Sequence, residues 1–560
     1  GNQRMPTRGK GRIKDQGSSS SPSDESTWQS SWFRITAGTV VLFVVSYLLV
    51  NHSSTCALPS STTTATSDPS GVDALRKRVE DLTEQNTALR QRQAESQYAS
   101  ESPGIERTMF RQATSAELEN STTWQCVVPH TFRHALKSLG HKLERKHENM
   151  YMTCQFHNVC LNLKNITGRP LVMNNLEMYV PQNTVDKAAA ARNTTPGEAP
   201  SFNLNFEFGQ LDWVLPTPIR VSVLPGPVPR EGTVYFSGSS VVLGGLFGAE
   251  NYGHHIGDLI YPLWAMQRLF NVNPDPAARV VLEHSCYNYF LLLNSPQRMV
   301  DKDINSCRRL LGKLSSLVTD KQFSVWPAWA AHPQVQGAQR VCVRRLVAGA
   351  GGLSLSYAYD AKWTLNYRGF LLQRLGLDPN TRPSRHVVRV LCPGKAVASW
   401  KAPHMATFQG VYFNTTPPDE RDWAKEVTRL YGLHAEPLYP EDMPTLKDEA
   451  LTMLNTSVLI TMGGGVAYMS LFLPFGSVLV MSEQHPREIS TFQHFKHTQV
   501  VHFQALRTPK DNTLAHAIDN VFKSSCLYKG DSCVPDASEL DLTETVFPFG
   551  KVDPLVGLFE

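Results

Sequence analysis

The sequence predicts an α/β protein, and three observations lead to that class. The chain has 560 residues, too many for one hydrophobic core, which indicates two or more folded units. Helical patterns such as 302–317 and 421–432 lie between short apolar runs. Those runs are typical of buried strands and fall at 219–224, 241–247, 278–284, 386–392, 458–462 and 477–481. Strands and helices that alternate in this way favour mainly parallel sheets flanked by helices.

A membrane anchor is predicted ahead of the folded part. Residues 35–50 carry no charge and are rich in leucine and β-branched residues. A span needs about 20 apolar residues and at least roughly 17, so this run must borrow neighbours. A cleaved signal peptide and a buried helix are the alternatives, but the long polar segment 1–34 favours an anchor. The basic residues within 1–34 predict a cytosolic tail and a single-pass type II protein of the Golgi or endoplasmic reticulum membrane.

Residues 51–123 are predicted to form a stem. Its first part, to about residue 70, is rich in Ser, Thr and Pro and is typical of a flexible spacer. A short coiled coil is predicted at 72–93, where successive a and d positions hold Val72, Leu75, Val79, Leu82, Asn86 and Leu89. Three heptads are marginal alone. The pattern therefore fits a homodimer joined through the stem, or a solvated amphipathic helix.

The chain beyond the predicted span carries features of a luminal protein. All ten cysteines lie there, and disulfides form and persist in oxidising compartments. Cys154 with Cys160, and Cys526 with Cys533, are close enough in sequence to pair locally, and Cys56 in the stem suits a bridge between chains. Acceptors for N-glycosylation stand at Asn120, Asn165, Asn193, Asn414 and Asn455.

The net charge and its distribution limit which partners the chain is expected to bind. The net charge is +4, and no basic block runs through the later chain. Nucleic-acid binding is therefore not expected. Structural zinc is not expected either, because the cysteine spacing lacks C-x-x-C with companion histidines.

A glycine turn is the first candidate binding element. The strand at 458–462 runs into Gly463, Gly464 and Gly465 and then into a helix predicted at 466–473. Backbone N–H groups at such a helix start can hold a diphosphate. Arg385 and Arg389 would neutralise phosphate charge. The alternatives are glycines that serve packing and arginines in surface ion pairs.

The second candidate is the stretch FGAENYGHHIGDLIYPLW, residues 247–264. His254 and Asp258 are four residues apart, so they share one face of a helix. An imidazole and a carboxylate at a helix start, beside apolar walls, can act as a general base on an alcohol. The alternative is that Asp258 caps local backbone and His254 is packed in the core.

Three motifs carry a family resemblance. Asn251, His254, Asp258 and Ile260 fit N-x-x-H-x-x-x-D-x-(L/I). Residues 384–391 fit S-R-x-x-x-R-x-(I/L), and residues 471–478, LFLPFGSV, are similar to F-L-P-x-G-(A/S)-x-V. In this order the motifs resemble glycosyltransferase family sixty-one. That family includes plant xylan arabinosyl- and xylosyltransferases and animal O-linked N-acetylglucosaminyltransferases.

The sequence departs from the family pattern at three places. The asparagine that follows the second arginine is absent, and the chain reads Cys392-Pro393-Gly394 there. Met462 stands where most members have a histidine that opens the glycine turn. Met481 replaces the acidic residue that usually ends the following strand, and Glu483 comes two positions later. The alternative function is therefore a catalytically inactive, membrane-anchored relative that binds carbohydrate or assists another protein.

The resemblance implies a GT-B architecture, in which two Rossmann-like domains face a cleft. It implies an acceptor-side domain at 124–380, a nucleotide-sugar-side domain at 381–525 and a C-terminal tail at 526–560. The implied reaction is inverting and uses no metal or cofactor. It moves a sugar from a nucleotide-diphosphate donor, expected to be UDP-linked, to a hydroxyl of a glycan or glycoprotein. A D-x-D metal motif at 301–303 is disfavoured because no apolar strand precedes it.

The resemblance also implies roles for the residues in these motifs. Asp258 or His254 would take the acceptor proton, and Asn251 and His255 would support the acceptor side. The donor would be bound by Arg385, Arg389, Gly463, Gly464, Gly465 and Glu483.

Overall fold

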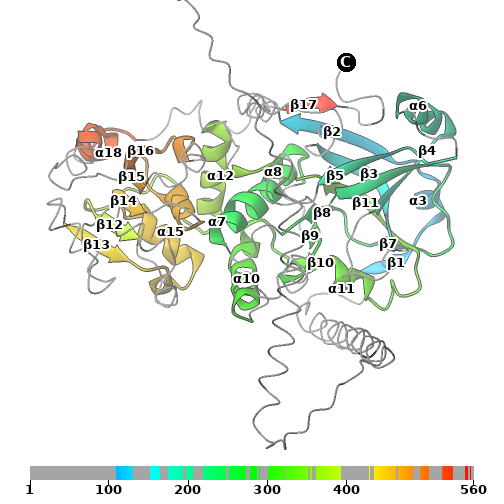
Figure 1. Ribbon diagram of the computed structural model, residues 1–560, viewed down its shortest axis with the longest axis horizontal. Helices are drawn as coiled ribbons and strands as arrows, with labels where there is room; N and C mark the ends of the chain where they lie inside the picture. Colours follow the sequence, from blue (N-terminus) through cyan, green and yellow to red (C-terminus); the bar gives the residue numbers. More distant parts are fainter. Residues whose placement is uncertain are drawn as a thin grey trace, which may run out of the picture. The chain divides into compact units, whose positions relative to one another are not determined.

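The computed structural model divides the chain into two units, Gly1–Gln85 and Asn86–Glu560. Almost all described residues belong to the second unit (Figure 1). They are 109–129, 152–163, 175–192, 197–205, 218–246, 251–272, 278–286, 301–321, 323–350, 353–355, 361–391, 434–461, 465–482, 492–503, 520–533 and 549–552, with 78, 194, 289, 428 and 555 alone.

The predicted fold class needs a correction at the membrane helix. Among the described residues, no helix combines the length and the apolar character needed to cross a bilayer. The transmembrane helix is therefore withdrawn, with the signal anchor and type II topology, and the class is mixed α/β. The predicted span at 35–50 itself lies outside the described residues, and so does the coiled coil at 72–93 apart from Arg78.

The first sheet has twelve strands and mixes strand directions. Its main path runs β10-β9-β8-β11-β3-β4-β6-β5, while β7 joins β1 to β11 and β2 joins β17 to β3. The bounds are β1 Phe110–Gln112, β2 Thr123–Pro129, β3 Thr153–Asn162, β4 Asn175–Val180, β5 Ser201–Asn205, β6 Pro218–Pro225, β7 Thr233–Phe236, β8 Val241–Gly244, β9 Arg279–Leu282, β10 Ser324–Val325, β11 Arg340–Ala348 and β17 Phe549–Val552.

Strand direction in the first sheet differs from an all-parallel Rossmann sheet. Strands β8, β9, β10 and β11 run parallel to their neighbours on one side of the sheet. Strand β3 is antiparallel to β11, β2 and β4. A short apolar run predicts burial but not the direction of its neighbour, so the sequence could not distinguish the two arrangements.

The second sheet is parallel throughout, with the order β13-β12-β14-β15-β16. Its strands are β12 Val388–Leu391, β13 Ala435–Leu438, β14 Val458–Thr461, β15 Ser477–Ser482 and β16 Thr498–Phe503 (Figure 1). Counted along the chain, this order is 2-1-3-4-5, as in doubly wound folds. Strand β14 is buried along its whole length, which explains its unbroken apolar sequence.

Helices connect and cover the sheets. They are α3 Ser115–Glu119, α6 Gln182–Arg192, α7 Tyr252–His254, η2 His255–Ile260, α8 Tyr261–Leu269, α10 Asp301–Leu314, η3 Ser315–Leu317, α11 Trp326–Ala330, α12 Ala361–Arg374, η6 Pro440–Asp442, α15 Leu446–Leu454, η7 Gly465–Phe472 and α18 Cys526–Lys529. Local chemistry sets one start clearly. Thr445 and Asp448 form a capping box that begins α15.

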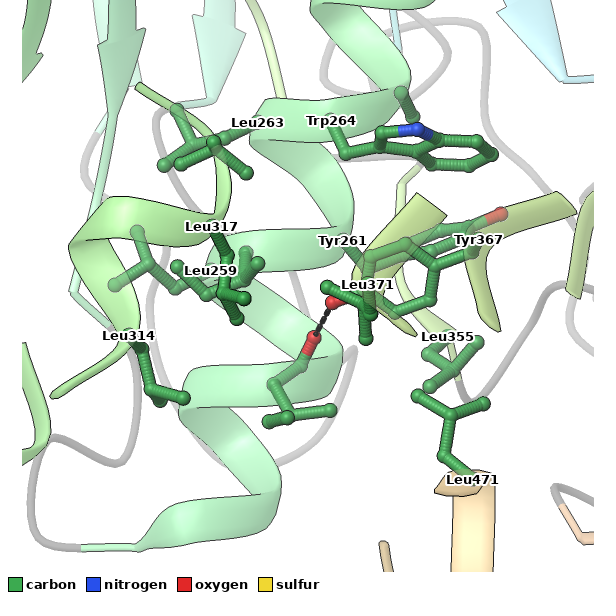
Figure 2. Packing of buried hydrophobic residues seen from close by; sticks show 14 of the residues in the cluster. Leu259, Tyr261, Leu263, Trp264, Leu314, Leu317, Leu355, Tyr367, Leu371 and Leu471 are labelled. Atoms are coloured by element: carbon green, nitrogen blue, oxygen red, sulfur yellow. Dashed lines mark hydrogen bonds between the residues drawn. The ribbon is translucent and has the colours of Figure 1, made fainter. Parts of the chain in front are cut away.

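The helix that follows the histidine motif lies in the largest cluster of buried residues. Figure 2 shows Leu259, Tyr261, Leu263 and Trp264 of this region packed among side chains from other elements. The same cluster includes Leu459 of β14 and Leu471 of η7. Tyr367 of α12 also donates a hydrogen bond of 2.8 Å to the Ile256 carbonyl. The motif is therefore held by a core that both sheets share.

Four disulfides link described cysteines, at Cys126–Cys154, Cys160–Cys342, Cys286–Cys307 and Cys526–Cys533. The sequence spacing allowed two local pairs, of which Cys526–Cys533 forms and Cys154–Cys160 does not. Both of those cysteines lie on β3, where six residues of strand separate them by about 20 Å, far beyond disulfide reach. Cys56 lies outside the described residues. This disulfide-rich fold is that of a secretory or luminal protein.

Candidate active site

The candidate site begins where the chain leaves β8 and forms α7. The Asn251 side chain caps this helix by accepting a hydrogen bond of 2.9 Å from the Gly253 N–H. The next six residues form the π-helix η2 instead of the continuous α-helix that the spacing predicted. π-Helical turns inside α-helices are frequently found at functional sites. Because a π-helical turn is less favourable than a regular α-helical turn, its presence here indicates that this segment must place its side chains in particular positions.

Hydrogen bonds link three polar side chains in series, those of His254, Asp258 and Ser354. His254 Nδ1 lies 2.6 Å from Asp258 Oδ2, and the Ser354 hydroxyl donates to Asp258 Oδ1 at 2.6 Å. The His254 side chain is 32% exposed and the Asp258 side chain only 3%. His254 is therefore the solvent-facing residue of the three, and the buried Asp258 carboxylate orients its ring. A base held by a third group in this way is the arrangement found in activated catalytic pairs.

The topology explains why Ser354 meets Asp258. Strands β8 and β11 are parallel neighbours, so the segments that follow them leave the same edge of the sheet. One segment carries Asp258 and the other carries Ser354, 96 positions later. Sites in α/β proteins commonly form outside the carboxyl ends of parallel strands. Ser354 was not predicted, because its sequence context of small residues shows no periodicity or motif.

The candidate side chains differ in their exposure to solvent. Both Asp258 and His255 are buried, at 4% and 1% exposure. Each Asp258 oxygen already has a partner in the His254 ring or the Ser354 hydroxyl. Of the Asp258 and His254 side chains only that of His254 is partly exposed, so it is the one that a molecule in the solvent could contact directly. The support expected from Asn251 and His255 is structural, through a helix cap and a buried ring.

Gly465, the last residue of the glycine turn, lies directly against α7. A Cβ placed on Gly465 would lie 1.8 Å from Asn251 Oδ1, and one on Gly253 would lie 2.6 Å from the Gly465 Cα. Real Cβ contacts essentially never fall below 3.0 Å. Glycine is thus required at both positions by close approach of the two backbones. The structure brings the two motifs into contact, although they are about two hundred residues apart in sequence.

The segment after the turn differs from the prediction. Residues Gly465–Phe472 form a 3-10 helix, η7, whereas an α-helix was predicted at 466–473. Its inner side chains, from Ala467 to Phe472, pack in the shared core. Gly463, Gly464 and Glu483 lie outside the described residues. Their predicted contacts with a donor remain predictions.

The two predicted donor-binding arginines lie elsewhere. Arg389 donates to the Thr452 carbonyl at 3.0 Å, to the Asn455 carbonyl at 2.9 Å and to the Thr456 hydroxyl at 2.6 Å. It therefore satisfies carbonyl groups at the end of α15, a common task for arginine. Arg385, with a side chain 73% exposed, pairs with Glu436 at 2.9 Å.

The sheet direction shows why these arginines do not join the site. Thr456 precedes β14 and Gly465 follows it, so the two lie at opposite ends of a parallel strand. Four residues of strand span about 13 Å. Arg385 and Arg389 are at the amino edge of the second sheet, and the glycine turn is at its carboxyl edge. Neither arginine therefore lies beside the glycine turn, where it was expected to neutralise phosphate charge.

Arg368 is a buried cation that the sequence did not single out. Its guanidinium donates to the Leu473 carbonyl at 2.8 Å and to the Pro379 carbonyl at 3.0 Å, and it lies 4.7 Å from the centre of the Phe475 ring. Burial lowers its pKa to about 9. Arg368 therefore fixes the L-F-L-P segment from α12. An arginine within a helix that is buried along most of its length gives no sequence signal of such a role.

Two of the predicted glycosylation acceptors can be placed. Asn120 and Asn455 are exposed at the ends of α3 and α15. Both are therefore open on the folded surface. Asn165, Asn193 and Asn414 lie outside the described residues.

Comparison with known proteins returned no relative. No protein-family model matches the chain. No curated protein matches it significantly. Within the described part of the chain, no group of three or more His, Cys, Asp or Glu side chains is arranged to hold a metal ion. Function must therefore be inferred from the geometry of the His254, Asp258 and Ser354 side chains and from the sequence motifs.

Proposed function

We propose that the protein is an inverting glycosyltransferase of the Golgi or endoplasmic reticulum lumen. It transfers a sugar from a UDP-linked donor to a hydroxyl group of a glycan or glycoprotein. The observation that carries the proposal is the His254–Asp258–Ser354 chain, which stands beside a glycine turn at the carboxyl edge of a parallel sheet. The motif resemblance to glycosyltransferase family sixty-one supports the same reaction class.

His254 supplies the base. Its Nδ1–H donates to Asp258, and in this mechanism its Nε2 accepts the proton of the acceptor hydroxyl. As the proton moves to Nε2, the hydroxyl oxygen bonds to the anomeric carbon from the face opposite the leaving group. The bond from that carbon to the phosphate oxygen breaks, and UDP departs with the electron pair. The Asp258 carboxylate stabilises the imidazolium that forms, and Ser354 holds the carboxylate in place.

The glycine turn supplies the leaving-group site in this proposal. Backbone N–H groups after the carboxyl end of β14 would bind the diphosphate, with Gly463 and Gly464 as the predicted donors. At Gly465 the Cβ position is filled by the Asn251 side chain, so this glycine serves packing against α7 and fixes the end of the turn beside the helix that carries His254. Arg385 and Arg389 are left out of the mechanism because of their place at the amino edge.

One observation favours the alternative of an inactive, carbohydrate-binding relative. The two arginines expected to neutralise the diphosphate serve the second sheet instead, through Glu436 and the end of α15. A protein that kept the fold and lost donor binding would show this arrangement. It would bind glycans but release no nucleotide.

A nucleotide-sugar screen separates the two functions. The full-length chain is incubated with a panel of UDP-sugars, with and without glycan and glycoprotein acceptors, and UDP release is measured. The proposal expects release from one donor and a product whose anomeric configuration is inverted relative to the donor. Silence across the panel, together with glycan binding, would favour the inactive relative. A product with retained configuration would contradict the mechanism.

A further inference from the structure

Asn455, a predicted glycosylation acceptor, stands beside an exposed leucine at the end of α15. Its backbone N–H donates to the Leu451 carbonyl at 3.1 Å. Its side-chain Nδ2, the atom that carries the sugar in an N-glycan, donates to the same carbonyl at 2.9 Å. The attachment point of a glycan is therefore fixed one helical turn from Leu451.

Leu451 is one of three large apolar side chains that are exposed among the described residues, and its exposed fraction is 39%. Lys447, Leu451 and Asn455 follow one another at intervals of four along the solvent-facing side of α15. Residues four apart on a helix are neighbours, with about 5–6 Å between their Cβ atoms. A single exposed leucine is ordinary on a protein surface. This one lies within reach of the first sugar on Asn455.

The hydroxyl residue of this acceptor is buried, which determines when a sugar can be attached. Ser457 supplies the hydroxyl of the N-x-S/T pattern and is fully buried. Its Oγ lies 3.3 Å from His386 Nδ1, and its N–H donates to the Val387 carbonyl at 2.9 Å. The acceptor must therefore be modified before the segments ahead of β12 and β14 come together.

The modification needs a co-reactant from the secretory pathway, an oligosaccharide linked to a lipid diphosphate. Asn455 Nδ2 bonds to the anomeric carbon of the oligosaccharide and loses a proton. The bond from that carbon to the phosphate oxygen breaks, and the lipid diphosphate leaves with the electron pair. Because this step precedes folding, the glycan is already in place when α15 packs.

We propose that Asn455 carries an N-glycan whose first N-acetylglucosamine covers Leu451 and stabilises the end of α15. The glycosylated amide keeps one N–H, which can still donate to the Leu451 carbonyl. The C–H face and the acetyl methyl group of the sugar remove apolar surface of Leu451 from water. The same helix end accepts hydrogen bonds from Arg389 at the carbonyls of Thr452 and Asn455. The inference requires a secretory or luminal protein and is independent of sugar transfer.

Asn120 provides a matched control. It also ends a helix, α3, and its N–H donates to the carbonyl four residues earlier, that of Ala116, at 3.2 Å. Its hydroxyl residue Thr122 is likewise buried and donates to the Asn158 carbonyl at 2.6 Å. Ala116 is exposed but offers only a methyl group to a sugar. The two acceptors therefore differ mainly in the side chain that the first sugar would meet.

The first test measures the glycan itself. The full-length chain is produced in a eukaryotic secretory host, and peptide mass spectrometry follows its release by peptide-N-glycosidase from the native protein. Asn455 is expected to be occupied, and Leu451→Ser should speed release there roughly three- to tenfold, with release at Asn120 unchanged. Ala116→Ser should alter neither rate. An unmodified Asn455, or equal release rates there in wild type and Leu451→Ser, would overturn the proposal.

The second test is a double-mutant cycle on Tm. Asn455→Gln and Leu451→Ser are made singly and together in the glycosylated chain. The combined loss should be smaller than the sum of the single losses by about 1 °C or more, because either change removes the same contact. The hydrogen bond to the Leu451 carbonyl is lost in both backgrounds and cancels. Asn120→Gln with Ala116→Ser should be additive. Additive losses at Asn455 and Leu451 would contradict the contact.

Discussion

Replacing Gly253 by alanine tests the contact between the two motifs. The added methyl would lie 2.6 Å from the Gly465 Cα and 2.7 Å from the nearest ring carbon of Tyr468. Ordinary contacts of a Cβ lie at 3.4–4 Å, so the methyl must push the two segments apart. The nearest atom belongs to the backbone, which yields less easily than a side chain. Gly253→Ala is therefore expected to destabilise the fold and to displace His254.

The magnitude follows from overpacking. Inserting a methyl into a packed contact costs about 1–3 kcal/mol, and more where the backbone must move. The control is Gly369→Ala in α12, where no described atom lies within 4 Å of the new methyl. In a helix interior, alanine is favoured over glycine by up to about 1 kcal/mol. Both substitutions add one methyl group, but Gly253→Ala is expected to lower the stability of the fold and Gly369→Ala to leave it unchanged or raise it.

Thermal unfolding of the full-length chain measures both variants. With about 2 °C per kcal/mol for a chain of this size, Gly253→Ala should lower Tm by roughly 2–6 °C. Gly369→Ala should leave Tm unchanged or raise it slightly. In the activity assay, Gly253→Ala should also lower kcat, whereas Gly369→Ala should not. A Gly253→Ala protein as stable as wild type would refute the packing of α7 on the glycine turn.

Three further predictions concern single side chains. Ser354→Ala removes a hydrogen bond to the Asp258 carboxylate, worth about 1.5–3 kcal/mol, and should lower kcat about tenfold or more in the UDP-release assay. Arg389→Met leaves the carbonyl groups at the end of α15 without their hydrogen-bond donor, so it should lower Tm. UDP affinity, measured by calorimetry, should stay unchanged. A loss of UDP affinity would instead indicate that Arg389 binds the donor. The Glu117 carboxyl has a pKa of about 2 beside Arg111, below its ordinary 4.5, so its stabilisation is present above pH 4.5 and lost as pH falls toward 2. The Tm difference between wild type and Glu117→Gln, equivalent to at most about 3 kcal/mol, should therefore shrink over that range, and a constant difference would argue against the ion pair.

The sequence predicted the buried strands well because their apolar runs are continuous. Strands β8, β9, β12 and β14 fall within predicted runs, and β15 extends one residue beyond its run. Direction and partner were not predictable, since an apolar run reports burial and not the neighbouring strand. The antiparallel pairing of β3 with β11 therefore came only from the structure. The same limit explains why the partner of Cys154, which lies on a neighbouring strand, was not predicted.

The candidate site was predicted in part. His254 and Asp258 are partners, as their spacing indicated, but the burial that makes His254 the outer group depends on the packing of η2. Ser354 reaches Asp258 through sheet topology, which no local pattern contains. Arg385 could have been placed better from sequence, because a residue ahead of a parallel strand lies at its amino edge and the glycine turn follows the carboxyl edge.

The most direct test of the account is the turnover number of His254→Gln. The full-length variant is compared with wild type at saturating donor and acceptor, and UDP affinity is measured alongside. Because general base catalysis contributes about 100- to 10,000-fold, kcat should fall by at least 100-fold with UDP affinity unchanged. A variant that keeps the wild-type kcat would contradict the assignment of His254 as the base.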